Sequence, residues 1–196
     1  MDSDLVRQHF LEPRNVGEVE NADALARDGA LVCGAALRIS LRVDGEQRIL
    51  DAKFRAAGCS LLIASASVLT EKVRNKTTAE VAALAQSSEN PILTEFSSPP
   101  RGKEHCAALA SQALLSAIQQ YSDSVRDEWE GDEALICTCF CVSERTIENE
   151  IRIGGLRTIP EVTKACNAGG GCRSCYSLIE DILAEVNGEG PLNFEL

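Results

Sequence analysis

The chain has 196 residues, of which 44% are hydrophobic, and this is enough for two modest domains with packed cores. Its formal net charge of -11 disfavours binding to the phosphates of nucleic acids. The amino terminus carries early acidic residues and no apolar signal segment, and no run of about 18 apolar residues follows it. We therefore expect a cytoplasmic protein with no nucleic-acid or membrane partner.

The first two thirds of the chain predict an α+β domain. Hydrophobic periodicity and turn signals predict, in chain order, helix 4–10, strand 37–43, strand 49–55, helix 60–73, a helix that begins at the capping box 77–80, and helix 104–121. The dipeptide Asp44-Gly45 predicts the turn between the two strands. The segment 123–133 is acidic and contains Gly131, which is typical of a linker.

The last third predicts a small helical domain. Helices are expected to begin at Ser143, at Thr158 with Pro160 inside its first turn, and at Arg173, the last one ending near Val186. The expected domain boundaries are 1–124 for the first domain, 125–133 for the acidic linker, 134–188 for the second domain and 189–196 for a carboxy-terminal tail.

Nine cysteines in a reducing compartment indicate metal or redox chemistry rather than a disulfide framework. Four of them form a C-x-C pair and a C-x2-C pair separated by 32 residues, namely Cys137, Cys139, Cys172 and Cys175. Two close pairs of thiolates suit a [2Fe-2S] cluster. Gly169-Gly-Gly171 permits close backbone approach, and a helix amino terminus favours thiolates. Zinc and unligated thiols are the alternatives at this site.

Three further cysteines, Cys33, Cys59 and Cys106, are dispersed through the first domain. Each lies at the edge of a predicted element, and His105 adjoins the last of them. Ends of elements often converge in a fold, so these side chains are candidates for one site. Three thiolates and an imidazole suit Zn²⁺ or an exposed iron–sulfur cluster.

The second domain resembles the bacterioferritin-associated-ferredoxin-like (BFD-like) [2Fe-2S] domain, as found in the centre of NifU. The matching segments are Ile136-Cys-Thr-Cys-Phe-Cys-Val-Ser143, Leu156-Arg-Thr-Ile-Pro-Glu-Val-Thr-Lys164 and Ala168-Gly-Gly-Gly-Cys-Arg-Ser-Cys175. This resemblance implies a permanent, redox-active [2Fe-2S] cluster on the C-x-C and C-x2-C cysteines. Cys141 and Cys166 fall outside the ligand pattern and are expected to be packing or near-surface thiols.

The first domain resembles the IscU-like scaffold domain that begins NifU. The matching segments are His9-Phe-Leu-Glu-Pro-Arg-Asn-Val-Gly17, Leu31-Val-Cys-Gly-Ala-Ala-Leu-Arg38, Phe54-Arg-Ala-Ala-Gly-Cys-Ser-Leu-Leu-Ile-Ala-Ser-Ala-Ser67 and Lys103-Glu-His-Cys106. This resemblance implies a small antiparallel sheet packed by helices. It also implies a transient cluster, built from iron and desulfurase-derived sulfur. The implied ligands are Cys33, Cys59 and Cys106, with His105 as an alternative and Lys103 as a nearby basic group.

Three features depart from the NifU-type scaffold. The family's Cys-Gly-Asp is Cys33-Gly34-Ala35 here, so a hard, exchangeable carboxylate ligand is missing. We therefore expect His105 or an external thiol to complete coordination and the cluster to leave more slowly. The segment 98–103 differs in spacing from the family's chaperone-binding motif, which argues against docking of that chaperone. The chain also ends soon after the second domain, so we expect it to lack the family's carboxy-terminal carrier domain.

These features together predict an iron–sulfur cluster assembly scaffold that is not an enzyme. Its expected partners are a cysteine desulfurase and apo iron–sulfur acceptor proteins, and the resemblance is compatible with a homodimer. One alternative is a ferredoxin-like redox or binding module whose first site holds a stable cluster or zinc. Another is a sulfur acceptor whose zinc-filled site only stimulates the desulfurase. No catalytic triad, phosphate loop or nucleotide fingerprint is present in the sequence.

Overall fold

The computed structural model describes residues 4–30, 33–86, 104–127, 131 and 133–188. The chain divides into two compact units, Met1–Tyr121 and Ser122–Leu196. Within the described ranges, none of the helices combines the length and the apolar character that crossing a bilayer requires. The domain boundaries at 124 and 134 stay predictions.

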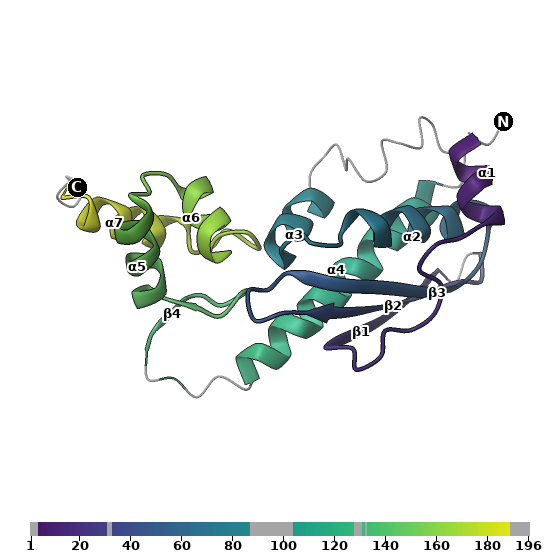
Figure 1. Ribbon diagram of the computed structural model, residues 1–196, viewed down its shortest axis with the longest axis horizontal. Helices are drawn as coiled ribbons and strands as arrows, with labels where there is room; N and C mark the ends of the chain where they lie inside the picture. Colours follow the sequence, from purple (N-terminus) through teal and green to yellow (C-terminus); the bar gives the residue numbers. More distant parts are fainter. Residues whose placement is uncertain (1–3, 31–32, 87–103, 128–130, 132, 189–196) are drawn as a thin grey trace. The chain divides into compact units, whose positions relative to one another are not determined.

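The first unit is an antiparallel sheet covered by helices (Figure 1). Its elements are helix α1 (Asp4–Leu11), strands β1 (Ala24–Ala30), β2 (Ala35–Val43) and β3 (Ile49–Ala57), and helices α2 (Ser60–Lys72), α3 (Thr78–Gln86) and α4 (Glu104–Asp127). The strand order is β1-β2-β3, so the middle strand pairs on both sides. This arrangement confirms the predicted α+β class with a small antiparallel sheet.

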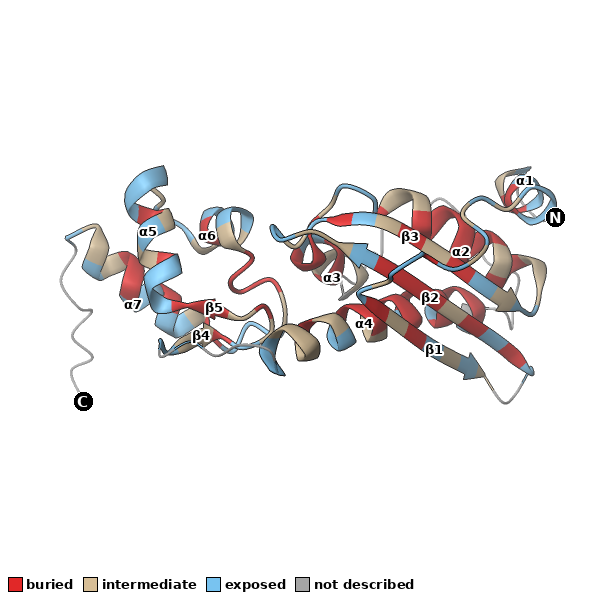
Figure 2. Cartoon of the chain, turned by 60° about the horizontal axis from the view of Figure 1, so that its bottom comes forward, coloured by how far each residue is buried: buried red, intermediate tan, exposed pale blue. Residues whose placement is uncertain are grey.

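The core of this unit lies between the sheet and the helices on one of its faces (Figure 2). Leu37, Ile39 and Leu41 alternate along β2 and are buried, as the period-two pattern predicted. Ile39 pairs with Phe54 of β3, which is also buried. Each large apolar side chain buried in this way contributes about 1.5–3 kcal/mol relative to an exposed one.

Two elements of the first unit differ from the sequence prediction. Strand β1 was not predicted, because its sequence ALARDGA is rich in alanine and has little intrinsic strand preference. It forms through pairing with β2, from Ala24 opposite Leu41 to Ala30 opposite Ala35. Helix α4 runs to Asp127 instead of ending near Tyr121. Arg126 contacts Asp123 at 2.6 Å one turn earlier, so the first part of the predicted linker is helical.

The capping box predicted at the start of α3 is present. The Thr77 hydroxyl accepts a hydrogen bond from the Glu80 backbone N–H at 3.2 Å, and the Glu80 carboxylate accepts one from the Thr77 N–H at 2.9 Å. We expect Thr77→Ala to lower the local stability of α3 by about 1 kcal/mol, whereas Thr77→Ser retains the cap. Hydrogen exchange of the α3 amides measures this difference, and equal protection in both variants would contradict it.

The second unit is helical apart from a short two-stranded ladder. Its elements are strands β4 (Leu135–Cys137) and β5 (Val142–Ser143), and helices α5 (Glu144–Gly154), α6 (Ile159–Cys166) and α7 (Tyr176–Val186). Ile147, Ile151 and Ile179 are fully buried between α5 and α7. The Ser143 hydroxyl caps α5 by accepting from the Thr146 N–H at 3.3 Å, as its position predicted. These contacts hold both cysteine segments on one small core.

The last helix begins later than predicted. Arg173 has a φ of 65°, a left-handed conformation that cannot continue a helix, so α7 starts at Tyr176 with Cys175 as its N-cap residue. Cys172 consequently lies in the loop before α7 and not within its first turn. The helix amino terminus adjoins only one of the two cysteines of the C-x2-C pair.

Candidate functional site

The three dispersed cysteines of the first unit meet at one end of its sheet. Cys33 lies in the turn between β1 and β2, and Cys59 is the N-cap residue of α2, directly after β3. Cys106 lies in the first turn of α4. The strand register explains why the loops that carry Cys33 and Cys59 lie side by side, because Ala36 of β2 pairs with Ala57 of β3 next to both loops. The fold thus joins residues that are far apart in the sequence.

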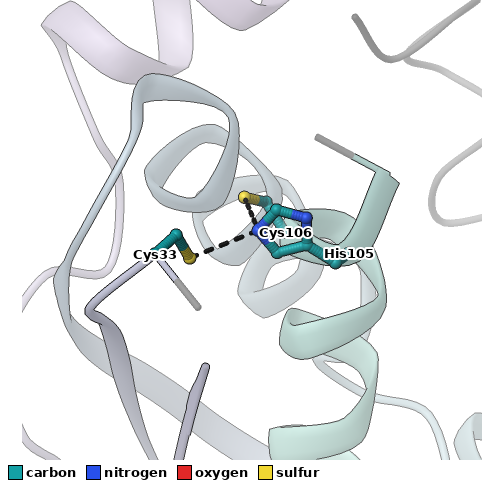
Figure 3. A group of neighbouring side chains, drawn as sticks. All are labelled: Cys33, His105 and Cys106. Carbon is teal, nitrogen blue, oxygen red and sulfur yellow. Dashed lines mark hydrogen bonds between the residues drawn. The ribbon is translucent and has the colours of Figure 1, made fainter. Parts of the chain in front are cut away.

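Figure 3 shows the side chains of Cys33, His105 and Cys106 gathered around the imidazole of His105. Nε2 of His105 is 3.2 Å from Sγ of Cys33 and 3.4 Å from Sγ of Cys106. The ligand atoms of these three residues all lie within 4.8 Å of one another. Sγ of Cys59 is 3.2 Å from Sγ of Cys106, so Cys59 belongs to the same cluster of donors. Three thiols and an imidazole are therefore gathered in one place.

The four residues of this first cluster differ in how far they are exposed to solvent. Cys106 is only 2% exposed, Cys59 is half-buried, and Cys33 and His105 are exposed. A buried thiol at the base gives the site a fixed anchor, while exposed donors leave it open to exchange with the solvent. Soft thiolates and an imidazole suit iron, zinc or an iron–sulfur cluster. The predicted neighbour Lys103 and the segment 98–103 lie outside the described residues.

Ala35 borders this first cluster. It is the first residue of β2, it is buried, and a Cβ added to Gly58 would lie 3.3 Å from its methyl group. Since Gly58 directly precedes Cys59, a side chain larger than alanine at position 35 would reach toward that loop. The next residue, Ala36, is exposed on the opposite face of the strand. Position 35 thus lies beside the loop that carries Cys59.

The four cysteines of the second unit form two contacting pairs. Cys139, in the turn after β4, donates to Sγ of Cys172 at 3.3 Å. Cys137 on β4 and Cys175 at the start of α7 are joined by a side-chain hydrogen bond. Cys137 and Cys175 are buried, Cys139 is half-buried and Cys172 is exposed. The fold therefore brings together all four residues of the spacing pattern.

The pKa values of these thiols correct one sequence-based expectation. A helix amino terminus was expected to favour the thiolates, yet burial, followed by the nearby Cys137 thiol, raises the pKa of Cys175 to about 12. Burial likewise raises the pKa of Cys139. The pKa of Cys172 is lowered, because the side chain and then the backbone of Ser174 hydrogen-bond to its sulfur. A coordinated cation would ionise such thiols outright.

The glycine loop before Cys172 permits the close approach predicted for it. A Cβ added to Gly171 would lie 2.9 Å from Cβ and 3.0 Å from Sγ of Cys139. Gly169 has a φ of 83°, and its backbone N–H donates to the sulfur of Cys175. Backbone donors aimed at ligand sulfurs are typical of iron–sulfur sites. The loop thus fits a [2Fe-2S] group held by the four cysteines.

We expect Gly171→Ala to remove most of the cluster from the second unit. The added methyl group must displace Cys139, a proposed ligand, so iron affinity should fall by more than about tenfold. The measurement is visible absorbance and iron content per purified chain. Gly45→Ala is the control, because a Cβ added there meets nothing within 4 Å. A Gly171→Ala protein with the full absorbance of the parent would contradict the close approach.

Cys141 and Cys166 lie apart from these contacts. Cys141 has a φ of 52°, and its Sγ is 3.9 Å from the carbonyl oxygen of Ser122. Sγ of Cys166 donates to the carbonyl oxygen of Val162 at 3.3 Å, within its own helix. Burial raises the pKa of both thiols. Both sulfurs donate to backbone carbonyls, as expected of thiols that have a packing role. Ser174, whose hydroxyl contacts the sulfur of Cys172, was not predicted, because its only signal in the sequence is its place between two candidate ligands.

Comparisons with known proteins agree with this geometry. Residues 1–127 match the NifU-like N terminal domain, and residues 135–185 match the BFD-like [2Fe-2S] binding domain. The nitrogen fixation protein NifU of Azotobacter chroococcum is 38% identical over 185 residues, which are 93% of this chain and 59% of that protein. The iron-sulfur cluster assembly scaffold protein IscU 1 of Archaeoglobus fulgidus is 38% identical over 121 residues, or 62% of this chain and 76% of that protein.

A solved structure shares the fold of the first unit. The N-terminal part of a nitrogen-fixing NifU-like protein from Brucella abortus matches with a TM-score of 0.52 at 19% identity, covering 62% of this chain and 94% of that chain. The chain spans about 59% of the length of the curated NifU proteins that it matches first. The family matches confirm the resemblance found in the sequence. The chain belongs to the NifU-like family, with a NifU-like N-terminal domain followed by a BFD-like [2Fe-2S] binding domain.

Proposed function

We propose that this protein is an iron–sulfur cluster assembly scaffold. Cys33, Cys59 and Cys106, with His105 as the alternative ligand, receive iron and sulfur at the open end of the first unit. The observation that carries this proposal is the meeting of these four donors, with ligand atoms of three of them within 4.8 Å of one another. The exposed Cys33 and His105 are suited to receiving a cargo and passing it to an apo-protein.

The proposed sulfur source is a cysteine desulfurase that delivers sulfane sulfur as a persulfide. Two sulfane sulfurs need four electrons to become two sulfides, and oxidation of two ferrous ions to ferric ions provides two of them. An external donor must supply the remaining two electrons. Thiolates stabilise the resulting ferric cluster, and exchange with thiolates of an acceptor releases it. The chain itself turns over no organic substrate, so its proposed role is that of a carrier on which other proteins act.

In the second unit, we assign Cys137, Cys139, Cys172 and Cys175 as ligands of a permanent [2Fe-2S] group. Such a group, when bound, gives and takes one electron at a time. The raised pKa of Cys175, near 12, means that this residue alone would stay protonated in neutral solution, and a bound cluster keeps it ionised. The buried Cys137 and Cys175 favour retention of the cluster, whereas two donors of the first site, Cys33 and His105, are exposed. The proposed compartment is the cytoplasm, where thiols stay reduced.

Metal analysis with an absorption spectrum of the isolated protein tests this division of roles. We expect the visible bands of a [2Fe-2S] cluster with about two iron ions per chain from the second unit, and a first site whose metal is removed readily by a chelator. A second unit that contains no iron would contradict the permanent site. Iron in the first unit that resists chelators as well as the second site does would contradict the transient one.

One observation favours a second candidate function. Three cysteines and one histidine are also a donor set of structural zinc sites. A zinc ion held by Cys33, Cys59, His105 and Cys106 would make the first unit a sulfur acceptor that stimulates the desulfurase without building a cluster. This alternative predicts zinc in the isolated protein, persulfide on one of these cysteines after reaction with the desulfurase, and no cluster transfer.

A further inference from the structure

Ser174 lies between two of the proposed cluster ligands and contacts one of them. Its Oγ is 3.1 Å from Sγ of Cys172. Its backbone N–H donates to the same sulfur. A thiolate that binds iron carries no proton, so in the loaded protein the serine hydroxyl is the donor and the sulfur the acceptor. Cys172 thus receives two hydrogen bonds from one neighbouring residue.

We propose that Ser174 is a positioning residue that raises the reduction potential of the cluster held by the second unit, through the hydrogen bond from its hydroxyl to the Cys172 sulfur. The inference rests on the proposed role of Cys172 as a ligand. It concerns how readily the cluster accepts an electron and not whether the cluster forms.

The sign follows from charge. Reduction adds one electron, so the ligand sulfurs become more negative and a hydrogen bond to them stabilises the reduced form more than the oxidised form. Loss of the donor therefore lowers the potential. The backbone N–H of Ser174 stays in place after any side-chain change, and water reaches the exposed Cys172, so part of the stabilisation remains.

Loss of the hydroxyl donor should therefore change the reduction equilibrium of the cluster about three- to tenfold. This corresponds to a shift of the midpoint potential of about 28 to 59 mV for one electron. Ser174 is exposed, so alanine or threonine at this position leaves the packed core unchanged. Threonine retains the hydroxyl and should therefore retain the potential. These two variants separate the hydrogen bond from any general effect of substitution in the loop.

The experiment compares the midpoint potentials of the full chain and its variants in an anaerobic spectroelectrochemical titration. Ser174→Ala should shift the potential downward by the stated amount, while Ser174→Thr stays near the parent. Ser177→Ala is the matched control, because it removes another exposed hydroxyl from the first turn of α7. Iron per chain is measured in each sample, so that every potential refers to the same fully loaded cluster.

Two failures can be told apart. If Ser174→Ala has the potential of the parent, or if Ser174→Thr falls with it, the tuning role is wrong while the ligand assignment stands. If the parent chain shows no [2Fe-2S] absorption, the ligand assignment in the second unit is itself wrong, and the inference falls with it.

Discussion

Replacing Cys106 with alanine is expected to abolish cluster assembly on the first unit and to leave the cluster of the second unit in place. Cys106 is the buried member of the first site, and its sulfur contacts both Cys59, at 3.2 Å, and His105, at 3.4 Å. Loss of a residue that merely orients a metal ligand already costs about 10- to 100-fold in affinity. Loss of a ligand at the base of the site should cost at least as much.

The measurement is the amount of cluster that passes to an apo-acceptor after anaerobic reconstitution with iron, cysteine and a desulfurase. Cys106→Ala should transfer less than about a tenth of the parent's amount. Cys166→Ala is the matched control, since the sulfur of Cys166 donates to the Val162 carbonyl within its own helix and belongs to the second unit. Normal transfer by Cys106→Ala would show that the described convergence is not the assembly site.

Replacing Ala35 with aspartate is expected to make the first site more labile and the metal-free protein less stable. Ala35 is buried beside Gly58, which directly precedes Cys59, so the new carboxylate would enter at the edge of the site. A carboxylate is a hard, exchangeable ligand that competes with the thiolates for iron. We expect the rate of cluster transfer to rise about tenfold, which corresponds to an activation free energy that is lower by about 1.4 kcal/mol. Without metal, the buried carboxylate should cost about 1–3 kcal/mol of unfolding free energy.

Ala36→Asp provides the matched control for this change. It adds the same charge one residue away, but Ala36 is exposed on the opposite face of β2. Its transfer rate should equal that of the parent, and its unfolding free energy should change little. An Ala35→Asp protein that transfers its cluster no faster than the parent would refute the idea that the missing carboxylate slows release.

The sequence was most informative where local patterns decide the structure. Strand β2 alternates Leu37, Ile39 and Leu41 with polar residues, and the start of α3 carries a complete capping box, so both were predicted correctly. The C-x-C and C-x2-C spacing likewise identified four cysteines that the fold brings together. In each case, the residues that determine the feature are near one another in the sequence or occur in a specific motif.

Features that depend on tertiary pairing or burial were harder to predict. The alanine-rich strand β1 forms only because β2 lies beside it, and no local pattern shows this. The raised pKa of Cys175 depends on burial and on Cys137, which is distant in the sequence, so the effect expected from the helix amino terminus was outweighed. Similarly, the spacing of Cys33, Cys59 and Cys106 gave no distances, because their meeting depends on the register of β2 and β3 and on where α4 packs.

The central claim is that one chain carries a permanent cluster and a transient one. Its most direct test is anaerobic reconstitution with iron, cysteine and a desulfurase, followed by a chelator challenge and incubation with an apo-acceptor. We predict two populations of cluster: one that resists the chelator and stays on the chain, and one that the chelator removes and the acceptor receives. A single resistant population with no transfer would contradict the scaffold function and favour a ferredoxin-like redox module.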